Sequence, residues 1–171
     1  MSGKILVAYA SRTGFTIGVA EKIASVLQEK GHQVVVAPVQ EIQETAPYSS
    51  VVIGSAIQGS AWLPEAIQFL QKHKTDLASK PVAAFQVCMT LAMRDGDKYQ
   101  NYVSSFMKPA RAIIKPVSEA SFTGGLDISR VPSLADKIKF KVSVIMGVWK
   151  EGDHRDWNAI QSWAREIAPK L

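Results

Sequence analysis

Residues 4–16 of the chain read KILVAYASRTGFT, and they carry the strongest indication of its fold. Lys4–Ala10 is almost wholly apolar, which is typical of a strand buried on both faces of a parallel sheet. The strand is followed by a turn of Ser, Thr and Gly residues. Apolar side chains then recur at helical spacing, at Ile17, Ala20, Ile23, Ala24 and Leu27, and Lys30 and Gly31 are typical of a helix end. The stretch therefore predicts a strand, a tight turn and a helix.

The rest of the chain repeats this alternation. Further strands are predicted over 33–38, 50–54, 82–87 and 117–123, with a polar connection over 40–49 that has room for a short helical turn. One helix is expected to begin at Pro64, one at the N-cap Asp156, and one to have an apolar face formed by Tyr99, Tyr102, Val103, Phe106, Met107 and Ala110. This pattern indicates an α/β fold with a doubly wound five-stranded parallel sheet in the order 2-1-3-4-5. The ligand crevice of such a sheet lies at the carboxyl ends of strands one, three and four.

Length and composition suit one domain over residues 1–171, because the chain has 171 residues, 47% of them hydrophobic and 20% charged. No apolar run reaches the roughly 20 residues of a membrane span, and the N-terminal residues do not resemble a signal peptide. Cys88 is the only cysteine and cannot form an internal disulfide. Together these features predict a cytoplasmic protein.

The charged and titratable residues limit which ligands, metal sites and catalytic residues can be expected. A net charge of +5 favours anionic partners, but the lysines and arginines are dispersed, so nucleic-acid binding is not expected. His32, His73 and His154 stand among polar neighbours without metal-ligand spacing, so they are interpreted as surface residues and no metal site is predicted. Cys88, at the end of a buried strand, is interpreted as a small apolar residue. No catalytic residue can be assigned from spacing.

The turn Ser11-Arg12-Thr13-Gly14-Phe15-Thr16 has two interpretations. Hydroxyl groups, backbone N–H groups and the positive end of a helix dipole together bind a phosphate, and Gly14 lets the backbone approach the anion. Arg12 would add charge there or extend into solvent. The same residue types also favour an ordinary capped helix start. The turn lacks the lysine of a P-loop and a G-x-G-x-x-G pattern, so neither ATP nor NAD is favoured.

Residues 7–16, VAYASRTGFT, followed by Ala20 and Ile23, resemble the flavodoxin signature. The resemblance covers almost the whole chain and extends to the menaquinone-dependent protoporphyrinogen dehydrogenases of flavodoxin-like fold, with weaker matches at 51–57, 69–73, 156–157 and 163–168. It implies a flavodoxin-like domain in which the first loop grips the phosphate of FMN. It also implies an oxidoreductase that passes electrons from a porphyrinogen through the flavin to a quinone.

If FMN occupies the crevice, its ring system lies between the loops 55–62 and 88–95. Gly59 would turn a carbonyl toward flavin N5, and backbone amides of the later loop would bind the pyrimidine edge. Trp62 would either stack on the ring or pack against the helix that begins at Pro64. The predicted FMN-binding residues are Ser11, Arg12, Thr13, Gly14, Phe15, Thr16, Ser55, Ala56, Ile57, Gln58, Gly59, Val87, Cys88 and Met89.

An insertion, 126–152, separates the fifth strand from the last helix, where 2 to 6 residues would suffice as a rough norm. Leu134, Ile138, Val142, Ile145 and Trp149 follow helical steps, and Lys137, Lys139 and Lys141 lie around them. Such a basic amphipathic helix would rest on an anionic membrane through 132–149, at the inner face of the cell membrane, or receive an apolar substrate. Residues 140–146 also alternate as a strand does, and a flap on the sheet edge or a dimer contact is an equal alternative. In the resembled dehydrogenases an insertion here is associated with membrane quinone.

Three functions follow. The first is an FMN-dependent oxidoreductase acting on a small molecule such as a porphyrinogen, with a quinone as acceptor. The second is a flavodoxin-type electron carrier that docks with a redox protein, although such carriers are commonly acidic and this chain is basic. The third is a flavin-free interaction domain on the same fold.

Overall fold

The computed structural model of the chain describes residues 3–93 and 95–171, so Met1, Ser2 and Arg94, the last within the predicted third loop, lie outside the described residues. A central parallel sheet is formed by β1 (Lys4–Ala10), β2 (Gln33–Pro38), β3 (Ser50–Gln58), β5 (Val82–Cys88) and β6 (Ser118–Thr123). The spatial order is β2-β1-β3-β5-β6, which confirms the predicted 2-1-3-4-5 order of parallel strands.

The third strand is longer than predicted. β3 continues to Gln58 instead of ending near residue 54, and the short β4 (Ala61–Trp62) pairs with it antiparallel. The expected loop 55–62 is therefore mostly a hairpin, with Gly59 and Ser60 at its tip. Both tip residues have positive φ, +58° and +62°, as the tightest hairpin turns require.

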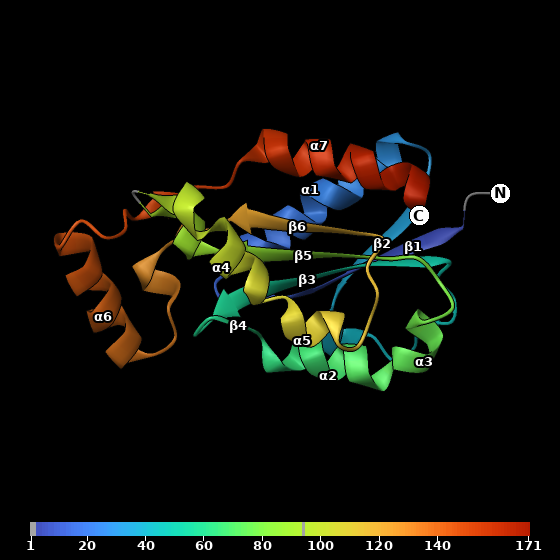
Figure 1. Cartoon of the computed structure of the whole chain (residues 1–171), viewed down its shortest axis with the longest axis horizontal. Helices are drawn as coiled ribbons and strands as arrows, with labels where there is room; N and C mark the ends of the chain where they lie inside the picture. The colour runs from blue at the N-terminus through green and yellow to red at the C-terminus, as the bar shows by residue number, and fades with distance from the viewer. Residues whose placement is uncertain (1–2, 94) are drawn as a thin grey trace.

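Helices cover both faces of the sheet (Figure 1). α1 (Phe15–Glu29) and α7 (Trp157–Ile167) pack on one face, while α2 (Pro64–Lys72), α3 (Lys74–Leu77) and α5 (Lys108–Arg111) lie on the other. Alternate residues of β1 serve the two faces: Ile5 and Val7 belong to the core under α1 and α7, and Leu6 and Ala8 to the core under α2. Burial on both sides explains why this strand is apolar throughout.

The helix expected around residues 99–110 is broken. The structure has η3 (Gly96–Tyr99), α4 (Gln100–Ser105) and α5 in its place. Pro109 has no backbone N–H to donate and occupies the first turn of α5, so it ends the preceding helix. Tyr99 and Tyr102 are exposed, contrary to the predicted apolar face, whereas the later apolar positions Val103, Phe106, Met107 and Ala110 are buried.

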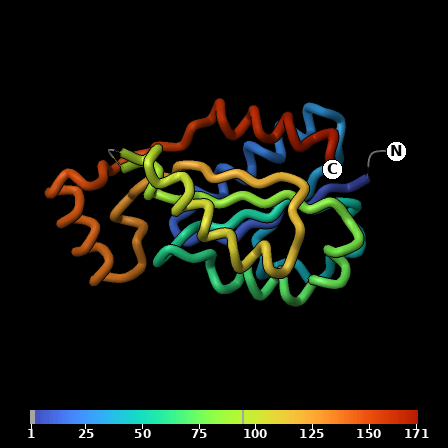
Figure 2. Tube along the Cα trace, in the orientation of Figure 1, coloured from blue at the N-terminus to red at the C-terminus, as the bar shows by residue number. Residues whose placement is uncertain are grey.

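The insertion forms a helical arm. η4 (Ile128–Arg130) precedes α6 (Leu134–Ile145), and β7 (Gly125–Leu126) pairs antiparallel with β8 (Gly152–Asp153) to close the base of the arm. The ambiguous stretch is thus a helix, and Trp149 lies beyond its end, against Phe140. α6 lies at the end of the molecule opposite both termini (Figures 1 and 2). The remaining short helices are η1 (Val39–Glu41), η2 (Met89–Ala92) and η5 (Ala168–Lys170).

Within residues 3–93 and 95–171, no helix is both long and apolar enough to cross a membrane.

Candidate functional site

The strand register brings three loops to one edge of the sheet. Ala10 at the end of β1 pairs with Ser55 of β3, and Ala56 of β3 pairs with Val87 of β5. The segments that follow these strands carry the predicted site residues. This edge is the topological switch point, where the chain leaves β1 toward one side and β3 toward the other.

The first loop leads into α1 through Gly14, which has φ +90° and ψ −10°. Ser11 Oγ accepts a hydrogen bond of 3.1 Å from Gly14 N, which tightens the turn. Among the described residues, no side chain caps α1, and its first turn contains no acidic residue. The N–H groups of that turn and the positive end of the helix dipole therefore remain available to an anion, which favours phosphate binding over the capped-turn interpretation.

Arg12 does not lie over this loop. Its guanidinium makes a two-point ion pair with Glu65 on α2, in which Nη2 is 3.0 Å from Oε2 and Nη1 contacts Oε1. Gln40 Nε2 donates to the same carboxylate at 3.4 Å. The hydrogen bonds to Arg12 lower the pKa of Glu65, and those to Glu65 raise the pKa of Arg12. Neither sequence alternative for Arg12, phosphate contact or a side chain free in solvent, describes this arrangement.

Two arginines that sequence reasoning missed approach the loop instead. Arg130 of the insertion has Nη1 at 3.4 Å from the Thr13 carbonyl oxygen, and Arg155 Nη1 donates to the Phe15 carbonyl oxygen at 3.1 Å. Their guanidinium carbons lie 5.8 and 5.1 Å from the centre of the Phe15 ring. No spacing signal could have found them, because the fold alone brings these distant segments together.

The second group is the β3–β4 hairpin. Ser55 is fully buried, and its hydroxyl accepts a hydrogen bond of 3.0 Å from Leu63 N, so this side chain supports the base of the hairpin. Gln58, Gly59 and Ser60 are exposed at the tip, and Ala56 and Ile57 are half-buried beside it. Ser60 Oγ lies 3.2 Å from the Tyr102 hydroxyl, which ties the tip to α4.

Trp62 lies in the core and is not placed to stack on a ligand. It is 3% exposed, and Nε1 donates to Gln86 Oε1 at 3.0 Å. Gln86, itself fully buried, donates through Nε2 to the Val103 carbonyl oxygen and to Ser121 Oγ, at 2.7 and 2.9 Å. Trp62 therefore packs inside the protein, which is the second of the two alternatives given for it. Gln86 holds Trp62 through a hydrogen bond that the sequence did not predict.

The third group follows β5. Val87 and Cys88 are buried at the strand end, as expected of an apolar cysteine, and Met89 begins η2 at the surface of the edge. Cys88 Sγ accepts from Thr90 N at 3.4 Å and so holds the start of this loop. A Cβ on Gly96 would lie 2.1 Å from the Leu91 carbonyl oxygen, so the return of the loop depends on glycine.

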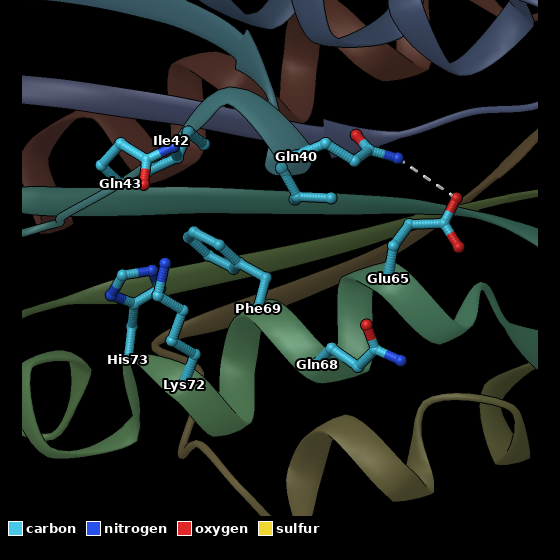
Figure 3. Close-up of a pocket in the computed structure, with 9 residues that line it drawn as sticks. Gln40, Ile42, Gln43, Glu65, Gln68, Phe69, Lys72 and His73 are labelled. Carbon is cyan, nitrogen blue, oxygen red and sulfur yellow. Dashed lines mark hydrogen bonds between the residues drawn. The ribbon is translucent and has the colours of Figure 1, made fainter.

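The structure has a cavity of about 300 Å³ away from these loops, between η1 and α2 (Figure 3). Its lining is Val39, Gln40, Ile42, Gln43, Glu65, Gln68, Phe69, Lys72 and His73. The predicted loops 55–62 and 88–95 contribute no residue to this lining, so the cavity is not the predicted site. His73 here is 8% exposed, which corrects its interpretation as a surface residue. Burial lowers its pKa, and among the described residues its Nε2 has no hydrogen-bond partner.

Within the described part of the chain, no cluster of three or more His, Cys, Asp or Glu residues has a metal-site arrangement.

A doubly wound sheet with a glycine-containing, hydroxyl-rich turn after its first strand, and two more loops at the same edge, defines a mononucleotide-binding protein of the flavodoxin class. Residues 6–156 match the family described as Flavodoxin domain, and the chain belongs to this family.

Relatives and solved structures agree with this assignment. The chain is 31% identical over 176 residues to protoporphyrinogen IX dehydrogenase (quinone) of Escherichia coli K12, covering 96% of this chain and 94% of the relative. The flavodoxin of Streptococcus pneumoniae TIGR4 has a TM-score of 0.62 at 16% identity, covering 99% of this chain and 100% of that one. Flavodoxin 2 of Bacillus cereus has a TM-score of 0.61 at 21% identity, with coverage of 99% and 100%.

The chain is therefore an FMN-dependent oxidoreductase of the flavodoxin family. Its first loop fits the phosphate of that cofactor, since α1 begins without a capping side chain among the described residues. The position of a Cβ on Gly14 has Arg130 Nη1 as its nearest neighbour, at 3.5 Å, so a cation stands at this open point of the loop. An anion at this point would meet both N–H donors and a guanidinium.

Proposed function

We propose that this protein oxidises a porphyrinogen with FMN and passes the electrons to a quinone. The observation that carries the proposal is the 31% identity to a protoporphyrinogen IX dehydrogenase (quinone), which spans 96% of the chain and so includes the insertion. The basic net charge of +5 suits a substrate that carries carboxylates.

In this proposal, Thr13, Phe15 and Thr16 would bind the FMN phosphate through backbone N–H groups, while Gly14 N donates to Ser11 Oγ and shapes the turn. The exposed hairpin tip at Gly59 and Ser60 would contact the ring system, and the amides after Cys88 would bind its pyrimidine edge. FMN, when bound, supplies the hydrogen-accepting and electron-donating chemistry. The protein orients the ring: Ser55 and Gln86 brace the hairpin from inside, and Tyr102 holds its tip. No side chain is assigned as a catalytic acid or base.

We further propose that α6 is the contact with a quinone-bearing membrane, through residues 132–149. Leu134, Ile138 and Ile145 are 73%, 57% and 85% exposed, and Met146 beside them is also exposed, so the arm presents several apolar side chains to solvent. Lys139 and Lys141 are exposed on the same helix. A helix that combines an exposed apolar stripe with cations binds at the interface of anionic lipid.

The reaction is tested under anaerobic conditions. The expected result is bleaching of the flavin absorbance on addition of protoporphyrinogen IX, and its return on addition of a menaquinone analogue. Absence of bleaching would rule out this substrate. A stable one-electron semiquinone, combined with reduction by a ferredoxin reductase, would support a flavodoxin-type electron carrier in its place.

The membrane contact is tested by co-sedimentation with vesicles that contain anionic phospholipid. The triple variant Leu134→Ser, Ile138→Ser, Ile145→Ser is expected to lose most of the binding of the unchanged protein. Val117→Ser is the matched control, because Val117 is 43% exposed outside the arm. Equal binding by the triple variant and the control would refute a role for α6.

A further inference from the structure

The first turn of α1 has an unusual electrostatic environment. The N-terminal end of a helix carries positive partial charge, so cations there are unfavourable and anions favourable. Yet two guanidinium groups, those of Arg130 and Arg155, contact the carbonyl oxygens of Thr13 and Phe15 at this end. The first turn itself contains no acidic residue that would compensate them.

The positive charge of Arg155 is balanced by an ion pair with Asp153, and the side chain has a structural role. Its Nε and Nη2 donate to Asp153 Oδ1 and Oδ2 at 2.8 and 2.6 Å, and its guanidinium carbon lies 4.3 Å from the centre of the Trp157 ring. The side chain is only 14% exposed. It links the segment before α7 to the start of α1, and its Nε, Nη1 and Nη2 all donate hydrogen bonds within the protein.

Arg130 is placed differently. Its ion pair with Asp127 uses Nε, at 2.9 Å from Oδ2, and its side chain is 58% exposed. Nη1 is turned the other way, toward the loop, 3.4 Å from the Thr13 carbonyl oxygen and 3.5 Å from the position of a Cβ on Gly14. The guanidinium therefore stands at the open side of the loop, where a ligand would lie.

The backbone that carries Arg130 is held in position. Asp127 accepts a hydrogen bond of 3.0 Å from Ser129 N, and Glu151 accepts one of 3.0 Å from Ile128 N across the base of the arm. Ile128 and Val131 on either side are buried. The cation is thus presented by a short anchored turn and not by a loosely held loop.

The loop's own arginine does not supply this charge, because Arg12 is paired with Glu65. A phosphate of FMN at the start of α1 would carry close to two negative charges and would lack a cation from its own loop. We propose that Arg130, from the insertion, is the cationic ligand of the FMN phosphate. This inference rests on the proposed position of FMN and assigns the insertion a role in cofactor binding in addition to its membrane contact.

The test compares two flavins that differ by the phosphate. After removal of bound flavin, dissociation constants for FMN and riboflavin are measured by quenching of flavin fluorescence. For Arg130→Gln the FMN constant is expected to rise about tenfold, as for loss of a charge-assisted hydrogen bond, while the riboflavin constant stays unchanged. Arg130→Lys is expected to recover part of the loss, since it keeps the charge. Arg165→Gln on α7 is the control for loss of one positive charge at the surface.

Arg12→Gln separates the two arginines, and it is expected to change the FMN constant less than Arg130→Gln does. The FMN constant of the unchanged protein should also rise more steeply with salt than that of Arg130→Gln. The same FMN constant in Arg130→Gln as in the unchanged protein would overturn this inference alone, and so would equal weakening of FMN and riboflavin. Failure of the unchanged protein to bind either flavin would overturn the proposed site together with it.

Discussion

Replacement of Gln86 by Leu tests whether a buried amide holds the β3–β4 hairpin in place. Gln86 is fully buried and makes three side-chain hydrogen bonds, to Trp62 Nε1, the Val103 carbonyl oxygen and Ser121 Oγ, at 3.0, 2.7 and 2.9 Å. Leu has a similar volume, so the change removes hydrogen bonds without opening a large cavity.

Loss of the hydrogen bond to Gln86 has a different cost for each of the three partners. Trp62 is 3% exposed, so its indole N–H would be buried without a partner, at a cost of roughly 1 to 3 kcal/mol. The Val103 carbonyl oxygen keeps its bond from Phe106 N at 3.1 Å, and Ser121 is half-buried and its hydroxyl can turn toward water. The total loss of unfolding free energy is therefore about 2 to 3 kcal/mol, which corresponds to a fall of roughly 5 to 10 °C in Tm for a chain of this size.

The assay is urea unfolding followed by circular dichroism, which gives the unfolding free energy and its dependence on urea. Gln86→Leu is expected to lower the midpoint with an unchanged slope. Combination with Trp62→Phe removes the orphaned N–H, so the two changes should be non-additive by about 1 to 2 kcal/mol. Ser121→Ala is the control and should cost under about 1 kcal/mol.

Two results would contradict this role of Gln86. One is a stability of Gln86→Leu within about 0.5 kcal/mol of the unchanged protein. The other is simple additivity of Gln86→Leu and Trp62→Phe, which would mean that the Trp62–Gln86 bond contributes nothing.

Three further changes have defined outcomes. Gly54→Ala places a Cβ 2.0 Å from Cζ of the buried Phe85 ring, so the unfolding free energy measured in urea should fall by about 3 kcal/mol. A fall below about 1 kcal/mol would contradict the close packing of Phe85 on Gly54. Asp156→Ala removes the cap whose carboxylate accepts from Ala159 N at 2.9 Å, and thermal unfolding should show a cost of about 1 kcal/mol that Asp156→Ser largely restores. Burial lowers the pKa of His73, with Lys72 acting in the same direction and Asp76 opposing, so the unfolded chain binds this proton more tightly than the folded one. The contribution of neutral His73 to the unfolding free energy is therefore present above about pH 6.5 and declines as the pH falls below that value. In His73→Leu the unfolding free energy should fall less steeply over the same pH range, and an unchanged pH dependence would exclude His73 as the source of the decline.

Much of the fold was predictable because buried strands and helix ends have recognisable local sequence patterns. β1 is a continuous apolar run from Ile5 to Ala10, β5 is apolar except for Gln86, and Asp156 marks the start of α7 through its capping chemistry. Sheet order follows from strand alternation and from the handedness of crossovers. The phosphate-type turn after β1 was also visible, because its hydroxyls and Gly14 are consecutive in sequence.

Element ends and exposed faces were less predictable. β3 continues beyond Gly54 because Ser55 and Ala56 still pair with its neighbours β1 and β5, and Ile57 and Gln58 pair with β4, which the apolar pattern does not predict. Tyr99 and Tyr102 fit a helical apolar face, yet the segment divides into η3, α4 and α5, and both rings are exposed. A pattern of apolar residues predicts that a face exists, but it does not reveal where a helix bends.

The doubly wound sheet and the hydroxyl-rich turn with Gly14 after the first strand could be predicted from the sequence alone, because periodicity and turn chemistry act between near neighbours. Which arginine lies nearest to that turn depends on the assembled fold, which pairs Arg12 with Glu65 and places Arg130 of the insertion at the start of α1. This is because an ion pair or a ligand contact depends on distance in space. Residues far apart in sequence acquire that distance only when the sheet and its helices have assembled.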